Sequence, residues 1–205
     1  MNRLAAVVVA LLLVSTTKTT GAESLEGQVR VGIDGLSLRD AGFVVVYLVD
    51  DGAGSRMTGE PPPVAIVRQR GAAFTPRFLI VSTGQKVEMP NDDVIFHNVF
   101  SYSEPNDFDL GLYAAGRSKT IEFLHPGLVR IYCSIHESMD GLIFVAPSRL
   151  FAAPDAQGRY SIRDVPAGRY HAHVWSERLP EISIPVAVRP GTAVSLDITL
   201  GQSDF

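Results

Sequence analysis

Apolar and polar residues alternate with a period of two over much of this 205-residue sequence, which is the pattern of β-strands that bury one face. Val29, Val31 and Ile33 alternate with polar or small residues, and the β-branched run over 43–49 is typical of a buried strand. No stretch shows the 3.6-residue period of an amphipathic helix. Further strands are expected at 74–81, 86–89, 119–123, 128–132, 141–145, 159–162, 169–175, 182–188 and 194–200. The sequence therefore predicts an all-β protein.

Proline and turn residues divide the chain into segments. The stretch 50–63 ends in three consecutive prolines, which the interior of a sheet does not accommodate because proline has no N–H to donate. A boundary near residue 60 follows. The segment after it is expected to form an antiparallel sandwich with its functional loops at one pole. The last segment is expected to form a second small sandwich with too few strands of its own, in which 182–188 pairs with 194–200.

The first residues have the order of a secretory signal peptide, with a cation at Arg3, an apolar run over 4–14 and a small residue at Ala22. The apolar run is too short to span a membrane comfortably, so we expect an exported, periplasmic protein without membrane insertion. Removing Arg3 and Lys18 with this segment leaves 16 basic against 22 acidic residues, a net charge of about −6. This balance does not favour nucleic acid or an anionic membrane surface as a partner.

Cys133 is the only cysteine of the chain and cannot form an internal disulfide. In an oxidising compartment a free thiol is a liability unless it is buried or held by a metal. His136 and Met139 follow at intervals of three, so one tight loop can direct a thiolate, an imidazole and a thioether toward a single ion. His97, after the turn at 90–92, offers a second imidazole. Two histidines, a cysteine and a weak axial methionine are the ligands of blue copper, so the sequence predicts one type 1 copper ion.

The region from about 74 to 145 resembles the cupredoxins. The resemblance is carried by the strand and turn from Gly84 to Asn91, the pair His97-Asn98, the turn Pro126-Gly127 and the motif Cys133-x-x-His136-x-x-Met139. The two-residue spacers are similar to those of the amicyanin-like members, of the type associated with methylamine utilization. The resemblance implies a Greek-key β-sandwich. It also implies that Asn98 stiffens the site by hydrogen bonding near the Cys133 sulfur or the ligand loop.

The last segment resembles the second half of a carboxypeptidase-regulatory-like, transthyretin-like module. The matching residues are Gly158-x-Tyr160-x-Ile162 and Val165-Pro166-Ala167-Gly168-x-Tyr170. The first half of such a module looks similar to 27–41 and the valines that follow. We therefore expect a discontinuous module with the cupredoxin inserted at a loop. The expected organisation is a signal peptide at 1–22, the first strands of the module at 23–60, the cupredoxin domain at 61–147 and the remainder of the module at 148–205.

Three other groups of residues have both a structural and a functional interpretation. His171 and His173 lie two apart on an expected strand, so their side chains face the same way. They could form a second metal site, but the preferred interpretation is that they are exposed or half-packed strand residues. A carbohydrate-binding face could be formed by Trp175, Tyr170 and Tyr160, but the preferred interpretation is that these aromatic side chains pack in the core or at its edge. The run 107–111 is expected to be a structured loop near the copper pole.

Two classes of function remain open at this point. The first is a one-electron carrier between periplasmic redox partners, such as a cytochrome or a dehydrogenase. The second is a periplasmic copper-binding or carbohydrate- or protein-binding module without electron transfer. Reversible cycling of bound copper would discriminate between them.

No enzymatic activity is expected. The chain has five histidines, of which the site uses at least two, so it cannot furnish the further catalytic copper centre of an oxidase or a nitrite reductase. A binuclear purple copper site needs two cysteines. A cysteine nucleophile lacks an evident base, and zinc does not usually take a methionine ligand.

Overall fold

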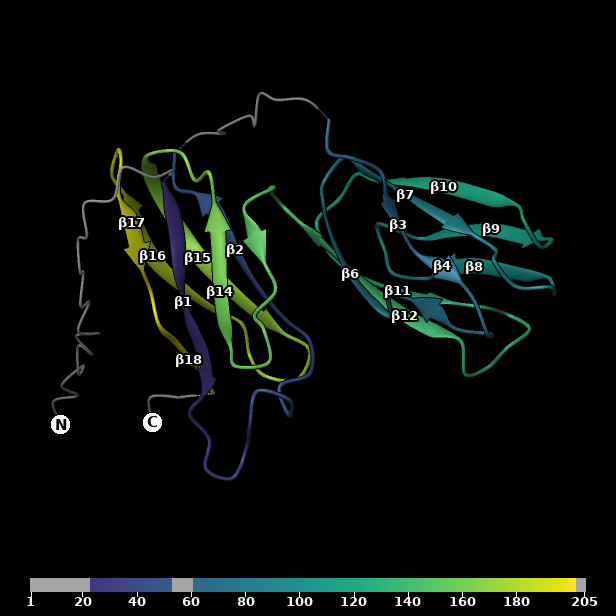
Figure 1. The fold of residues 1–205 in the computed structure, drawn as a ribbon, viewed down its shortest axis with the longest axis horizontal. Helices are drawn as coiled ribbons and strands as arrows, with labels where there is room; N and C mark the ends of the chain where they lie inside the picture. The colour runs from purple at the N-terminus through teal and green to yellow at the C-terminus, as the bar shows by residue number, and fades with distance from the viewer. Residues whose placement is uncertain (1–22, 53–60, 202–205) are drawn as a thin grey trace, which may run out of the picture. The chain divides into compact units, whose positions relative to one another are not determined.

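The computed structural model describes residues 23–52 and 61–201. Every regular element in these two ranges is a β-strand (Figure 1), which confirms the all-β fold class. Across the same ranges, no helix is long and apolar enough to cross a membrane. The expected signal peptide, 1–22, and the middle of the proline-rich connector, 53–60, lie outside the described residues.

The described residues fold into two compact units, one made of 23–46 with 152–201 and the other of 47–52 with 61–151. The borders fall within β2 (Val44–Asp50) and β13 (Phe151–Ala152), which are neighbours in one sheet. The sequence predicts domain borders at 60 and 147, where a change of composition marks a loop.

The first sheet of the discontinuous unit is arranged around its N-terminal strand. Its members are β1 (Ser24–Val31), β14 (Arg159–Arg163), β17 (Ala193–Ser195) and β18 (Ile198–Leu200). The central β1 is antiparallel to β14 and parallel to β17 and β18. At Gly27 the backbones are so close that an added β-carbon would lie 1.9 Å from the carbonyl oxygen of Leu196, so only glycine fits there.

The second sheet of this unit has the order β13-β2-β15-β16, where β15 is Gly168–Ser176 and β16 is Ile182–Val188. The expected pairing of 182–188 with 194–200 is wrong. β16 pairs with β15, whereas 194–200 is split between β17 and β18, which pair with β1 in the other sheet. The turn at 189–192 therefore leads from one sheet to the other. Alternation predicts that each strand exists but not which strand it will pair with.

The continuous unit has a five-stranded sheet in the order β6-β12-β11-β8-β9, a three-stranded sheet in the order β10-β7-β3, and the hairpin β4-β5. The strands are β3 (Ala65–Ile66), β4 (Arg68–Gln69), β5 (Phe74–Thr75), β6 (Phe78–Ser82), β7 (Gln85–Pro90), β8 (His97–Ser101), β9 (Phe108–Tyr113), β10 (Ser118–Phe123), β11 (Gly127–Tyr132) and β12 (Asp140–Ala146). The sandwich is expected to be antiparallel, and most of its strand pairs are, but β12 runs parallel to β6 and β3 parallel to β7. Strand direction depends on the connections, which periodicity does not report.

Two local expectations in this unit also change. The run 107–111, expected to be a loop, lies largely in β9, because it pairs with β8 and half-buries Phe108 and Leu110. The pairing of β8 with β9 shifts register beside Gly111, whose φ is 63°. This irregularity interrupts the alternation of apolar and polar residues that would have indicated a strand. The expected strand 74–81 is two strands, β5 and β6, interrupted at Pro76, which cannot donate to a ladder.

The core of the continuous unit reaches the end of the sandwich where β8 begins and β11 ends. Buried apolar side chains from both sheets form one cluster, among them Val81, Met89, Val99, Phe123 and Ile131. Cys133 and Met139 belong to the same cluster. The loop that follows β11 is thus anchored in the core at both of its ends.

Candidate metal centre

Three of the predicted ligands come from two neighbouring strands and one loop. His97 is the first residue of β8, and Cys133 directly follows β11, which pairs with β8 through Tyr132 and Phe100. The loop from Cys133 to β12 also carries His136. Pairing of β8 with β11 therefore brings together residues that are 36 positions apart in the sequence.

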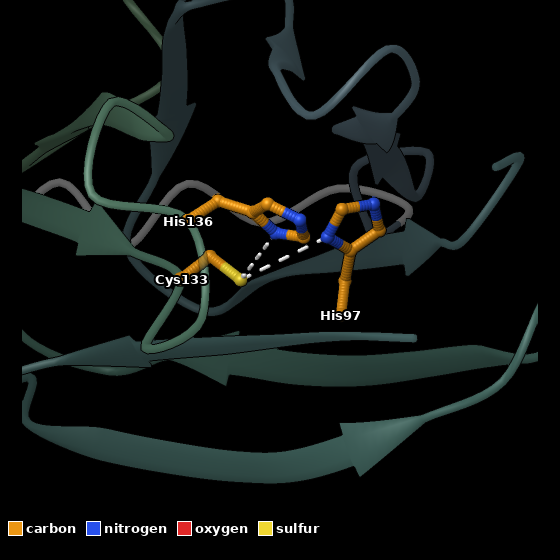
Figure 2. Close-up of side chains that lie close together, drawn as sticks. All are labelled: His97, Cys133 and His136. Atoms are coloured by element: carbon orange, nitrogen blue, oxygen red, sulfur yellow. Dashed lines mark hydrogen bonds between the residues drawn. The ribbon is translucent and has the colours of Figure 1, made fainter. Parts of the chain in front are cut away.

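The donor atoms of these three side chains converge, as Figure 2 shows. The sulfur of Cys133 lies 3.8 Å from Nδ1 of His97 and 3.6 Å from Nδ1 of His136. All three ligand atoms lie within 4.8 Å of one another, and the imidazole centroids are 4.7 Å apart. Metal bonds of about 2.0 Å to nitrogen and 2.3 Å to sulfur span such separations. The residues present therefore fit a single ion.

Met139, the fourth predicted ligand, is held by the backbone of the same loop. Its N–H donates to the carbonyl of His136 at 3.0 Å, and its own carbonyl accepts the N–H of Cys133 at 3.2 Å. Only 1% of Met139 is exposed, and Cys133 and His97 are also buried, whereas His136 is half-buried. The loop thus closes on itself with its thiol and thioether residues inward and one imidazole partly open to solvent.

A carboxylate missing from the sequence-based site fixes the orientation of His97. Asp93 Oδ2 accepts a hydrogen bond from Nε2 of His97 at 2.7 Å, so the ring proton sits on Nε2 and the lone pair of Nδ1 points toward Cys133. The signal in the sequence is an aspartate four residues before a histidine. That spacing has no fixed meaning outside a helix, so the sequence did not identify it.

The carboxylate of Asp93 is itself held by a tight turn. The N–H of Gly71 donates to Oδ1 at 2.7 Å, and the N–H of Ala72 donates to Oδ2 at 3.0 Å. These donors lower the pKa of Asp93 to about 2, Ala72 contributing most, with a smaller effect from His97. Both turn residues have left-handed φ values, 65° and 52°, which direct neighbouring N–H groups toward the same anion. Asp93 therefore stays ionised and joins the β4-β5 hairpin to His97.

Asn98 connects β8 to the ligand loop. Its Oδ1 accepts the backbone N–H of Ser134 at 2.8 Å and the hydroxyl of Ser134 at 3.0 Å. Ser134 directly follows Cys133, so this side chain acts on the loop at the position next to the thiol. Asn98 is buried, which makes its two bonds costly to lose.

A buried phenol lies opposite His97 in the sheet. Tyr113 on β9 pairs with His97, and its hydroxyl donates to the carbonyl of Met89 at 2.8 Å. The amide of Gln69 donates in turn to the Tyr113 hydroxyl. Burial raises the pKa of Tyr113 to about 12, so the phenol stays neutral and has a packing role beside the site.

Solved structures with similar folds include a Cu-containing nitrite reductase, a purple cupredoxin and amicyanin. No model of a protein family matches the sequence, and no match is found among curated proteins. A Cu-containing nitrite reductase (NirK) from Thermus scotoductus SA-01 is 28% identical with a TM-score of 0.41, over 44% of this chain and 24% of its own. A purple cupredoxin from Nitrosopumilus maritimus is 26% identical with a TM-score of 0.36, over 40% of this chain and 99% of its own. A reduced amicyanin variant is 19% identical with a TM-score of 0.38, over 40% of this chain and 81% of its own.

These similarities cover less than half of the chain, which in turn spans about a quarter of the nitrite reductase. These three similarities do not show the transthyretin-like resemblance of the outer segments.

Exposed apolar side chains flank both histidines of the site. Val94, Ile95 and Phe96 precede His97, and Ile135 precedes His136; these four residues are called the apolar rim. Val94 is 95% exposed and Phe96 58% exposed. Large apolar residues that stay this exposed in neighbouring segments are typical of a surface that contacts another molecule.

The other residues singled out in the sequence lie outside this site. His125 is exposed on a bend before β11. The preferred packing interpretation agrees with the burial of Tyr160 and Tyr170, which donate to the carbonyls of Leu196 and Pro166 and leave no three-aromatic face for a carbohydrate. Only Trp175 of the three is partly exposed.

Proposed function

We propose that this protein is a type 1 copper protein that carries single electrons between redox partners, and that it is not an enzyme. The observation that carries the proposal is the convergence of Nδ1 of His97, Nδ1 of His136 and Sγ of Cys133, with Met139 in the same buried loop. Copper, when bound, supplies a one-electron couple between Cu(I) and Cu(II).

The donor set supports copper over other first-row metals. A thiolate and a thioether are soft ligands that suit Cu(I), while the imidazoles suit both oxidation states. Zinc sites use cysteine, histidine and carboxylate ligands, and Met139, the fourth residue predicted to bind the ion beside His97, Cys133 and His136, is not a usual zinc ligand. Asp93 contacts the far nitrogen of His97 and so orients a ligand instead of supplying one.

The surroundings of the ligands support electron transfer. Asp93 and Asn98 restrain His97 and the loop before any ion binds, so the donors change position little between oxidation states. His136 is the ligand with partial exposure, and Ile135 of the apolar rim directly precedes it in the sequence. We assign His136 as the electron exit and the rim as the contact surface for a partner, a cytochrome or a dehydrogenase.

The proposed location is the periplasm. The signal-peptide pattern at 1–22 supports export. The burial of Cys133 is compatible with an oxidising compartment, because a buried thiol is protected from oxidants.

The test is the absorption and EPR spectrum of the protein after addition of Cu(II), compared with Cys133→Ala and with His125→Ala as the matched control. We expect an intense blue thiolate-to-copper band and a narrow copper hyperfine splitting in the wild type and in the control. Both features should vanish in Cys133→Ala. A colourless wild type, or a wild type whose EPR spectrum shows only tetragonal copper signals and is unchanged by the loss of Cys133, would refute type 1 copper.

Voltammetry separates the carrier from a copper-binding module without electron transfer. A carrier gives a reversible one-electron wave whose peak separation stays small as the scan rate rises. A blue protein with an irreversible or very slow response would retain the metal site and lose the proposed function.

A further inference from the structure

A second group of metal-binding side chains lies on the discontinuous unit, on one face of the β15-β16 pair. Tyr170, Ala172 and Val174 of β15 are buried on one side of the strand. His171 and His173 alternate with them and are half-buried on the other side. On the neighbouring strand, Ser183 pairs directly with His173, so its side chain projects from the same face.

The two imidazoles direct nitrogen atoms toward the same point. The hydroxyl oxygen of Ser183 lies 3.3 Å from Nδ1 of His171 and 3.5 Å from Nε2 of His173, and the ring centroids are 6.4 Å apart. Both nitrogens therefore surround one small volume at the surface of the sheet. An ion bonded at about 2.0 Å to each would take the place of the hydroxyl between them, after the rings rotate toward it.

A carboxylate orients one of these rings, as Asp93 does for His97. Glu181 Oε1 lies 3.0 Å from Nδ1 of His173. An Nδ1–H donated to Glu181 leaves the lone pair on Nε2, the nitrogen that faces Ser183. A histidine held by a carboxylate through its far nitrogen is the usual support of a metal-binding imidazole.

We propose that His171 and His173 form a second copper site, which binds Cu(II) through two imidazole nitrogens with water completing the shell. The ligands are nitrogen and oxygen only, a set that suits Cu(II) in tetragonal geometry and lacks the sulfur that favours Cu(I). Cu(II) is the tightest-binding divalent ion of the first row at such a site. The protein then takes two copper ions, one at a thiolate and one at this partly exposed face.

The test is a calorimetric titration of the full chain with Cu(II), together with EPR at one and two equivalents. The wild type should bind two equivalents, the second giving a tetragonal signal with wide hyperfine splitting and nitrogen couplings. The double variant His171→Ala/His173→Ala should bind one equivalent and keep the signal of the first site. His125→Ala, which removes an exposed imidazole elsewhere, should still bind two.

Glu181→Gln gives a second, milder test that does not depend on the double variant folding. It should keep the second equivalent with an affinity reduced by about 10-fold or more, the usual effect of losing the partner of a ligating histidine. Thermal unfolding checks that each variant is folded. A second copper that survives in the folded double variant, or an affinity unchanged by Glu181→Gln, would overturn the site, as would a wild type that binds one equivalent.

The two sites fail independently. Cys133→Ala should remove the blue band and keep the tetragonal signal, whereas the histidine double variant should do the reverse. A result that refutes the proposed function therefore does not refute the second copper site, and a result that refutes the second site does not refute the proposed electron carrier.

Discussion

The carboxylate of Asp93 lies 2.7 Å from Nε2 of His97, on the side of the ring away from Cys133. The same carboxylate accepts the N–H groups of Gly71 and Ala72. A turn between two short strands thereby sets the orientation of a buried imidazole on another strand. Four predictions concern this arrangement and the ligand loop from Cys133 to Met139.

Replacing Asp93 by Asn should weaken copper binding by about 10- to 100-fold, because the neutral amide holds the His97 ring less firmly and lowers its basicity. Competition with a coloured chelator measures the affinity. Asp92→Asn is the matched control, since Asp92 is the adjacent residue and its carboxylate pairs with Arg68 at the surface. Equal affinities of the two variants would show that Asp93 has no role in positioning the ligand.

The stability of the metal-free protein should fall steeply in acid because of Asp93. Its pKa is lowered from 3.8 to about 2 by the N–H groups of Ala72 and Gly71, so its ionised form stabilises the fold. Because the pKa of Asp93 is lower in the folded protein, the ionised carboxylate makes its full contribution to the free energy of unfolding at a pH above its unfolded pKa of 3.8. That contribution is lost as the pH falls from 3.8 toward 2.

Thermal unfolding from about pH 7 to pH 2 measures this contribution. The melting temperature of the wild type should drop more than that of Asp93→Asn below about pH 4, and the two curves should run parallel above about pH 5. Parallel curves over the whole range would contradict the assignment.

Met139→Leu should keep the blue band and raise the reduction potential. The intense colour arises from the Cys133 thiolate, whereas removal of a weak axial donor favours the lower coordination of Cu(I). The swap conserves volume at a buried position and should cost less than about 1.5 kcal/mol of stability. Met89→Leu makes the same change at a second buried methionine of this core and should leave the potential unchanged. Equal potentials in both variants would remove Met139 from the ligand set.

Asn98→Ala should destabilise the protein by about 1–3 kcal/mol, because the N–H of Ser134 loses its acceptor. It should also slow electron self-exchange, since the loop beside Cys133 is less restrained. Ser134→Ala removes only the hydroxyl bond and should cost about 0.5–1.5 kcal/mol. Chemical denaturation and NMR line broadening in mixed oxidation states give the two quantities. A larger loss in Ser134→Ala than in Asn98→Ala would contradict this account.

The sequence was most informative where structure is local. The spacing of Cys133, His136 and Met139 keeps them in one loop, closed by the hydrogen bond between the ends of that loop. The alternation of apolar residues is likewise a local property, and it was sufficient to predict the all-β class and most of the strands. Both depend on neighbours within a few residues, whose geometry the backbone fixes.

The tertiary structure decided everything that depends on which distant segments meet. Pairing of β8 with β11 brings His97 to Cys133, and the turn at Gly71 and Ala72 meets Asp93 through the β4-β5 hairpin. The same holds for the parallel strands beside β1 and for the nitrogen atoms of His171 and His173 around Ser183. The two-residue alternation of apolar and polar residues along a strand is the same whichever strand it pairs with. Partner and direction are set by packing of the whole core, which no local pattern contains.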